Sequence, residues 1–543
     1  MSVEVKVNNR YTCRIKPYIQ PFERKLALAE LAALAGTVPQ PLGSTTDKTL
    51  EYAVSTARPM TELVEKLAYW ESVKDTQTRL TTQALREATI NVVRNGVAVE
   101  HIEWLVTLKV NSSLPNRRSL RYGPHGIHEY RGKFFPQLVR SLINIAQVPL
   151  HGIVADPMSG SGTTIVEAVL AQSHGLGLDM NPLSVLMGQT KTAVLSVDPA
   201  EIVQAYKAIQ AQLLNAPNDQ ALTYFATLLP EDQTYLRGWF SEQVLYDLDR
   251  IASAIHALPV ALTVRDLLRL ALSNIIRKVS WQKNDDLRVR KELRPEADID
   301  PINEFLEELR RSVKAVLALL YYNRDTPLGT FHLQNGDARA MSHFWQAWRG
   351  QVDAVITSPP YATALPYLDT DRLSLLYLGL LSRRGLRERD QTMIGNREVT
   401  EKKRQAYWHV FMENKAALPL SVITLIEKID RLNATKTVGF RRKNLPALLT
   451  KYFLDMKDVL AGIAQMLKPK APAFVVVGDN HTLAGDEKVA ITTSALLVDI
   501  AQMVGLEACE HVPMEMLVSR DIFKKNAVAS EVILHFRRPG DGR

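Results

Sequence analysis

A glycine-rich turn between a short apolar run and an apolar helix is the first feature of the sequence that could do chemistry. The run HGIVADP at residues 151–157 is followed by MSGSG at residues 158–162 and by the helix-forming segment TTIVEAVLAQ at residues 163–172. Glycines let a backbone turn sharply and approach a ligand closely, and a helix N-terminus offers free N–H groups to a polar or anionic group. We expect ligand contacts from Asp156, Pro157, Ser159, Gly160, Ser161, Gly162, Thr163 and Thr164.

A second acidic residue, Asp179, ends the next apolar run, GLGLD, 23 residues after Asp156, and Asn181 follows closely. A carboxylate at the end of such a strand can accept hydrogen bonds from two ribose hydroxyls. Two other nucleotide motifs fit less well, because the dinucleotide fingerprint needs a glycine where Ile165 stands and the P-loop needs a lysine where Thr163 stands. The pattern therefore favours a nucleoside-containing ligand, with a purely structural glycine turn as the alternative.

The string Thr357-Ser358-Pro359-Pro360-Tyr361 follows directly on the apolar run VDAVI. Two successive prolines cannot continue a central strand, so the chain must leave the sheet there as a stiff turn. Carbonyl groups beside prolines lack local N–H partners and can face a ligand. A tyrosine just beyond can stack on a base, which contributes about 1–3 kcal/mol per base. The alternative is a loop that merely buries a tyrosine.

The composition sets the background for these two loops. Of the 543 residues, 46% are hydrophobic and 23% are charged, which is typical of a globular protein. The chain is too long to fold around one compact core. No apolar run is long enough for a membrane span, and the N-terminus has no apolar signal core, so we expect a cytoplasmic protein without a membrane partner. The two cysteines have no partner at metal-ligand spacing, which predicts no metal site. The formal charge of +8 mildly favours a nucleic-acid partner.

The alternation of apolar runs and helical patterns predicts an α/β fold with a doubly wound sheet, interrupted by helices. Residues 196–329 carry several helix-period segments, with Ser241 and Thr263 placed as N-caps. We therefore expect four regions: residues 1–110, mostly helical; residues 111–195, the first part of the sheet; residues 196–329, a helical insertion; and residues 330–543, the second part of the sheet, with a polar insertion at 362–450.

The two loops together resemble those of the DNA amino-methyltransferases, which make N4-methylcytosine or N6-methyladenine with S-adenosyl-L-methionine (AdoMet). In that family a loop like DPMSGSGTT binds the cofactor and a loop like TSPPY is catalytic. The segment HEYRGKFFPQL at residues 128–138 resembles the part that closes over the methionine end of AdoMet, and NGDAR at residues 335–339 resembles the part that contacts its adenine. The matching residues are Lys133, Phe134 and Pro136 in the first segment and Asp337 in the second.

The resemblance implies a Rossmann-like class I AdoMet-dependent methyltransferase sheet with a helical N-terminal region and a helical insertion. It also implies double-stranded DNA as the partner, a flipped-out target base, and the catalytic residues Ser358, Pro359, Pro360 and Tyr361. Ser358 and the Pro359 carbonyl would accept hydrogen bonds from the amine, and Tyr361 would stack on the ring. Serine at this place favours cytosine N4 as the target. The cofactor loop precedes the catalytic loop here, whereas many family members with SPPY have the reverse order.

Three alternatives stay open at this point: an N6-adenine DNA methyltransferase, an RNA base amino-methyltransferase, and a DNA-binding subunit with an inactive cofactor fold. C5-cytosine methylation fits poorly, because it needs a cysteine nucleophile and neither Cys13 nor Cys509 lies near the TSPPY loop. By resemblance, we expect a bacterial or archaeal setting in a restriction-modification or defence system. The helical insertion and residues 362–450 are the candidates for target recognition.

Overall fold

The computed structural model describes most of the chain. The described residues are 9–43, 50–94, 96–130, 132, 134–215, 221–283, 290–293, 295, 299–362, 367–396, 399–515 and 530–540. Lys133, expected to help close the cofactor site, lies outside this described part.

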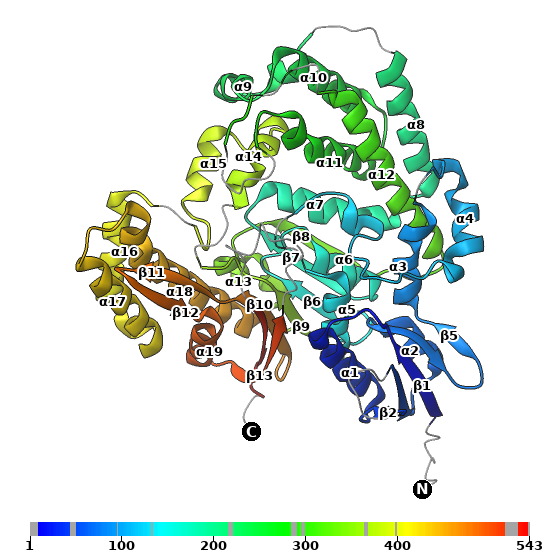
Figure 1. Ribbon diagram of the computed structural model, residues 1–543, viewed down its shortest axis with the longest axis horizontal. Helices are drawn as coiled ribbons and strands as arrows, with labels where there is room; N and C mark the ends of the chain where they lie inside the picture. The colour runs from blue at the N-terminus through cyan, green and yellow to red at the C-terminus, as the bar shows by residue number, and fades with distance from the viewer. Residues whose placement is uncertain are drawn as a thin grey trace.

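A seven-stranded sheet forms the centre of the molecule (Figure 1). Its strands are β6 (Ile153–Asp156), β7 (His174–Asp179), β8 (Phe331–Asn335), β9 (Ala354–Thr357), β10 (Pro472–Gly478), β13 (Glu507–Glu515) and β14 (Ser530–Arg537). The order is β13-β14-β10-β9-β6-β7-β8; neighbours from β8 to β10 are parallel, whereas β14 is antiparallel to both β10 and β13. The order reverses between β6 and β9, and ligands bind at the carboxyl edge beside such a reversal. The predicted Rossmann-like class I methyltransferase sheet is therefore confirmed.

Helices cover both faces of this sheet. They include α5 (Pro136–Ile145), α6 (Thr163–Leu170), α7 (Pro182–Ala193), α13 (Met341–Phe344), α18 (Phe440–Met466) and α19 (Thr493–Met503). Alternate residues of the strands enter two different cores. Val355 and Val475 pack with α18 and α19 on one face, whereas Ile356 and Val476 pack with α5 on the other. Burial on both faces explains why the strands read as continuous apolar runs in the sequence.

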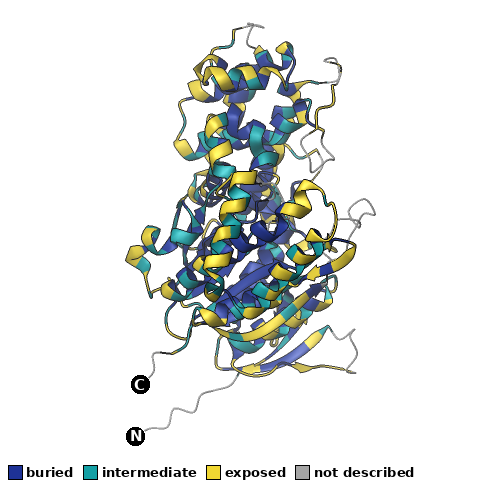
Figure 2. Ribbon diagram, turned by 90° about the vertical axis from the view of Figure 1, so that its left-hand side faces the viewer, coloured by how far each residue is buried: buried dark blue, intermediate teal, exposed yellow. Residues whose placement is uncertain are grey.

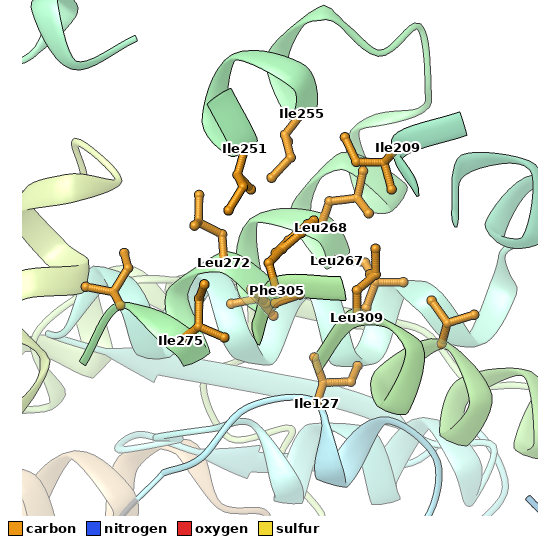
Figure 3. Close-up of a cluster of buried hydrophobic side chains, with 14 of the residues drawn as sticks. Ile127, Ile209, Ile251, Ile255, Leu267, Leu268, Leu272, Ile275, Phe305 and Leu309 are labelled. Atoms are coloured by element: carbon orange, nitrogen blue, oxygen red, sulfur yellow. The ribbon is translucent and has the colours of Figure 1, made fainter. Parts of the chain in front are cut away.

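A helical tier stands above the sheet (Figure 1). It contains α8 (Pro199–Asn215), α9 (Pro230–Arg237), α10 (Glu242–Ala257), α11 (Leu262–Val279) and α12 (Pro301–Tyr322). The expected N-cap is confirmed at Ser241, which accepts a hydrogen bond from the Val244 N–H, but Thr263 lies inside α11, whose N-cap is Ala261. Figure 3 shows part of the core of this tier, which includes Ile209, Ile251, Ile255, Leu267, Leu268, Leu272, Ile275, Phe305 and Leu309.

Residues 362–450 were expected to be a polar insertion, but their described part is largely helical. The elements there are α14 (Tyr367–Tyr377), α15 (Arg383–Asp390), α16 (Glu401–Glu413) and α17 (Leu420–Ala434), followed by the start of α18. Leu373 and Leu376 of α14 are buried in the same core as the helical tier. These helices were not predicted from the sequence, because basic runs on exposed helix faces hid the apolar residues between them. Helix α17 packs on a hairpin of β11 (Asn480–Ala484) and β12 (Glu487–Ile491).

The N-terminal region needs a larger correction, because it contains an antiparallel five-stranded sheet as well as helices. The strands are β1 (Asn9–Ile15), β2 (Gln40–Pro41), β3 (Glu51–Thr56), β4 (Trp70–Lys74) and β5 (Thr78–Leu80), and the helices are α1 (Pro21–Ala35), α2 (Met60–Lys66), α3 (Thr82–Val92) and α4 (Ile102–Lys109). Tyr11, Cys13 and Ile15 alternate with less buried residues along β1, which is a strand pattern. The apolar residues of α1 next to it repeat at helical spacing and dominated the sequence signal of this region.

The helical tier and the sheet are joined by a continuous interior. Figure 2 shows buried residues running from the sheet into the tier, and Leu183 and Met187 of α7 share one core with α10, α11 and α12. Within the described residues, no helix is both long and apolar enough to cross a membrane.

A buried ion pair joins the N-terminal sheet to α3. Lys16 follows β1, and its Nζ donates to Glu87 Oε1 at 2.7 Å and to the Ala68 carbonyl at 2.7 Å. Both charged side chains are almost completely buried. Desolvating two charges is costly, and only close contact and further hydrogen bonds offset that cost.

We predict that Lys16→Met lowers the free energy of unfolding by about 3–5 kcal/mol, because Glu87 then carries an uncompensated buried charge. Urea denaturation followed by circular dichroism measures the change. Lys25→Met, which alters an exposed lysine of α1, is the matched control and should change stability by less than about 0.5 kcal/mol. Equal, small effects of the two substitutions would contradict the role of the ion pair.

Candidate active site

A cavity of about 770 Å³, including the space at its mouth, opens at the carboxyl edge of β6, β7, β8 and β9. Six separate segments of the sequence meet around it. Its lining consists of Tyr130, Gly132, Phe134, Asp156, Pro157, Met158, Ser159, Gly160, Ser161, Thr163, Asp179, Met180, Asn181, Gly336, Ala338, Ser358, Pro360, Met393 and Ile394. The glycine-rich turn and the TSPPY loop therefore border one cavity.

The glycine-rich turn needs its glycines for both conformation and space. Gly160 and Gly162 have φ values of +48° and +81°, a region that residues with a Cβ rarely adopt. A Cβ at Gly160 would lie 2.8 Å from the ring of Tyr130, and one at Gly162 would lie 2.5 Å from the Gly188 Cα. Helix α6 begins directly afterwards at Thr163. The turn thus brings backbone and the start of a helix against the cavity.

Two carboxyl groups face this cavity, Asp156, which is buried, and Asp179, which is half-buried. Asp156 accepts hydrogen bonds from the Thr357 hydroxyl at 2.7 Å and from the Met158 N–H at 3.1 Å. Burial raises the pKa of Asp156 to about 7, although these hydrogen bonds oppose the shift. A carboxyl group in this position exchanges its proton near neutral pH and is stabilised as an anion by any cation or donor that enters the cavity.

Asp179 is the second carboxyl group, and it binds the backbone of both the glycine-rich turn and the segment that follows β7. Its oxygens accept from the Gly160 N–H and the Asn181 N–H, both at 2.8 Å. Burial raises the pKa of Asp179 to about 6, while the two N–H groups and the charge of Arg389 lower it. The Asn181 side chain caps α7 through the Leu183 N–H and donates to Asp371 at 2.8 Å.

The TSPPY loop leaves the sheet at the end of β9. Ser358 and Pro360 line the cavity, and the preceding Thr357 is the residue bonded to Asp156. The Tyr361 hydroxyl donates to Glu531 Oε1 on β14. The loop therefore starts from the strand beside the one that carries the glycine-rich turn.

One wall of the cavity comes from Met393 and Ile394, which lie between α15 and α16. Lys451 of α18 donates to the Met393 carbonyl at 2.8 Å. Arg339 contacts the adjacent Thr392 carbonyl and Asp337. Although burial opposes it, this contact with Arg339 lowers the pKa of Asp337. A charged cluster thus holds an apolar wall in place.

Most residues predicted for the site border the cavity, but six described ones do not. Those on its lining are Phe134, Asp156, Pro157, Ser159, Gly160, Ser161, Thr163, Asp179, Asn181, Ser358 and Pro360; those outside the lining are Pro136, Gly162, Thr164, Asp337, Pro359 and Tyr361. Pro136 is the first residue of α5, and Thr164 donates to the Ile356 carbonyl. Asp337 is paired with Arg339, whereas its neighbours Gly336 and Ala338 face the cavity.

The sequence reasoning missed Tyr130, Gly132, Met158, Met180, Gly336, Ala338, Met393 and Ile394. Tyr130 lies in the segment HEYRGKFFPQL and was within reach of that pattern. Met393 and Ile394 carry no local signal, because their position depends on the packing of α15, α16 and α18. Within the described part of the chain, no group of three or more His, Cys, Asp or Glu side chains could hold a metal ion.

The arrangement suits a ligand with hydroxyl groups, a cationic group and an apolar ring system. The two carboxyl groups can accept hydrogen bonds from hydroxyls or compensate a positive charge. Phe134, Met393 and Ile394 provide apolar surface beside them. Ser358 and the neighbouring carbonyls offer acceptors at the edge of the same cavity, where a second reactant could meet the ligand.

Comparison with known proteins finds similarity to type II methyltransferases. It is 23% identical to the type II methyltransferase M.BsoBI of Geobacillus stearothermophilus over 414 residues, which cover 70% of this chain and 78% of that protein. It is also 23% identical to the type II methyltransferase M.MvaI of Kocuria varians over 394 residues, which cover 69% and 80%. No family model matches the chain.

Among solved structures, TrmN from Thermus thermophilus covers 98% of this chain and is itself covered completely, with 10% identity and a TM-score of 0.31. The assignment of the fold rests on the strand order and not on this similarity. The chain is a homologue of the type II methyltransferases over most of its length.

Proposed function

We propose that the chain transfers a methyl group from AdoMet to the exocyclic N4 amine of cytosine in double-stranded DNA. The observation that carries this proposal is that the acid-lined cavity and the TSPPY loop form one site. Ser358 and Pro360 lie on the lining that also includes Asp156, and Thr357 bonds to Asp156 at 2.7 Å.

AdoMet is the cofactor, and the residues of the cavity fit it. Asp179 is placed to accept hydrogen bonds from ribose hydroxyls, and Asp156 lies where it can compensate positive charge. The N-terminal turn of α6 and Gly160 allow close backbone approach, while Phe134 and Ile394 offer apolar contacts. When bound, AdoMet supplies a methyl group that is activated by the sulfonium charge.

The protein's own contribution is to orient the acceptor. An exocyclic amine is a weak nucleophile, because its lone pair is delocalised into the ring. Ser358 and the Pro359 carbonyl accept the amine hydrogens and so favour a nitrogen with an available lone pair. Tyr361 stacks on the flipped base and sets its angle to the cofactor. Such alignment supplies most of the rate enhancement, since the donor is already activated.

The decisive experiment is methyl transfer from labelled AdoMet to unmethylated genomic DNA, followed by digestion to nucleosides and mass spectrometry. We expect N4-methylcytosine. N6-methyladenine would keep the mechanism and refute the role of Ser358 in selecting cytosine, and label in total RNA but not in DNA would refute the DNA substrate. A restriction or defence partner stays a prediction from the resemblance.

We predict that Tyr361→Ala lowers the turnover number about 10- to 100-fold, because the stacking of the base is lost. The Kd for AdoMet, measured by calorimetry, should change less than about twofold, since Tyr361 does not border the cofactor cavity. Tyr246→Ala is the matched control, because that hydroxyl bonds to Glu242 on the same helix, away from the TSPPY loop. Unchanged turnover in the Tyr361 variant would refute the assigned role.

The raised pKa values predict that AdoMet binds more weakly in acid. Binding needs ionised Asp179 and Asp156, whose pKa values before binding are about 6 and about 7. Affinity is therefore full well above pH 7, falls by up to about tenfold per pH unit between 7 and 6, and falls by up to about a hundredfold per unit below both values. Calorimetric titrations between pH 8 and pH 5.5 measure this loss.

Asp179→Asn tests which group is responsible. It should weaken AdoMet binding about 10- to 100-fold at pH 8, because a charged acceptor is lost, and it should leave only the pH dependence of Asp156. Asp325→Asn, at an exposed aspartate, should leave both affinity and pH profile unchanged. A wild-type affinity that does not vary with pH would contradict the prediction.

A further inference from the structure

Two side chains, one on β14 and one at the start of β11, contact the TSPPY loop or the residue after it. The reaction described above does not use either of them. Glu531 lies on β14 opposite Gly478, the last residue of β10. Asn480 lies two residues beyond Gly478, at the start of β11. The register of the two strands therefore brings Glu531 and Asn480 to the same end of the sheet, beside the loop.

Each of the two side chains binds a different part of the loop. The Glu531 carboxylate accepts the hydrogen bond of the Tyr361 hydroxyl. The Asn480 Nδ2 donates to the carbonyl of Ala362 at 2.9 Å. The ring of Tyr361 is thus held at its far end, while the backbone just after it is held by an amide.

The backbone of Tyr361 is confined on a third side. Gly395 has a φ of +74°, and a Cβ there would lie 3.0 Å from the Tyr361 carbonyl oxygen and 3.1 Å from Pro360 Cβ. The segment that supplies the cavity wall at Met393 and Ile394 therefore also passes closely over the loop. With the backbone fixed in this way, the hydroxyl contact decides the orientation of the ring.

The position of Glu531 is costly without such a role. Burial raises the pKa of this carboxyl group, and none of the described Lys, Arg or His side chains forms an ion pair with it. Glu531 is half-buried, and withdrawing an acidic group from water without a cation is unfavourable. The group nonetheless aims at the hydroxyl of the one aromatic residue in the loop.

The hydroxyl of Tyr361 has no part in stacking, because a base stacks on the π face of the ring. A phenylalanine would offer the same face. The hydroxyl instead gives the ring a fixed anchor, and small misplacements in an active site can lower a rate by orders of magnitude.

We propose that Glu531 and Asn480 are positioning residues that fix the Tyr361 ring in the orientation in which it stacks on the target base. The inference rests on the proposed function of the TSPPY loop and extends it to the β10 and β14 end of the sheet. Because the contacts lie outside the cofactor cavity, they act on the rate of methyl transfer and leave AdoMet binding unchanged.

The test is a double-substitution cycle on single-turnover methyl transfer to DNA. Glu531→Ala and Tyr361→Phe should each lower the rate constant about tenfold, and the double variant should be no slower than either alone, because both remove the same contact. Glu531→Gln should stay within about threefold of wild type, since its amide oxygen still accepts the hydroxyl. The Kd for AdoMet should stay within about twofold in all variants.

Glu510→Ala, at an exposed glutamate on the neighbouring strand β13, is the matched control and should not change the rate. Asn480→Ala should lower the rate several-fold without changing the Kd for AdoMet. Multiplicative effects of Glu531→Ala and Tyr361→Phe, or a Glu531→Gln variant as slow as Glu531→Ala, would overturn the proposal.

Thermal unfolding without DNA separates this proposal from the proposed function. It is measured for the wild-type protein, Glu531→Ala, Tyr361→Phe and the double variant. The contact predicts that the double variant unfolds at the temperature of the less stable single variant. If the wild-type protein transfers no methyl group to DNA but this coupling is present, the proposed function fails and the Glu531 contact stands. If methyl transfer occurs and neither rate nor unfolding shows coupling, the positioning role fails.

Discussion

The hydrogen bond between Thr357 and Asp156 is the contact on which the rest of the site depends. It joins β6 and β9, the two strands between which the order of the sheet reverses. One of these strands leads into the glycine-rich turn and the other into the TSPPY loop. Because the carboxyl group is buried and its pKa is raised, the Thr357 hydroxyl supplies part of the stabilisation that its anion needs. A single hydrogen bond of 2.7 Å thus fixes the distance between the glycine-rich turn and the TSPPY loop.

The glycine-rich turn and the TSPPY loop could be predicted from the sequence, because each is a local pattern at the end of an apolar strand. Parallel strands place their carboxyl ends at one edge, so Asp156, Asp179 and Ser358 had to converge once the sheet was assigned. The cavity walls at Tyr130 and Met393 could not be predicted, since they depend on how distant helices pack. Asp337 shows the limit of a motif: the segment reaches the cavity, but the charge of Arg339 turns that carboxyl group to an ion pair.

The N-terminal sheet was missed for a different physical reason. Its strands are short, and their polar positions include residues that are buried but paired. Glu30 of α1 is fully buried, and it accepts hydrogen bonds from the Ala68 and Tyr69 N–H groups just before β4. Such a glutamate reads as the polar face of a helix in the sequence. Only the tertiary contacts reveal that it holds the start of a strand, together with the Lys16 and Glu87 pair.

Hydrogen bonds tie the helical tier directly to the walls of the cavity. His128 contacts Ser273 of α11 at 2.9 Å, and the Glu129 N–H donates to Asn274 at 2.9 Å, which places the adjoining Tyr130 over Gly160. Asn181 uses its oxygen to cap α7 and its amide to reach Asp371 of α14. Both polar atoms of the Asn181 side chain are therefore bonded to groups of the protein at the junction with the helical tier. A displacement of α11 or α14 must move the cavity lining with it, because these contacts are made by short side chains with little freedom. The helices inserted between the two parts of the sheet thus form one unit with the candidate site.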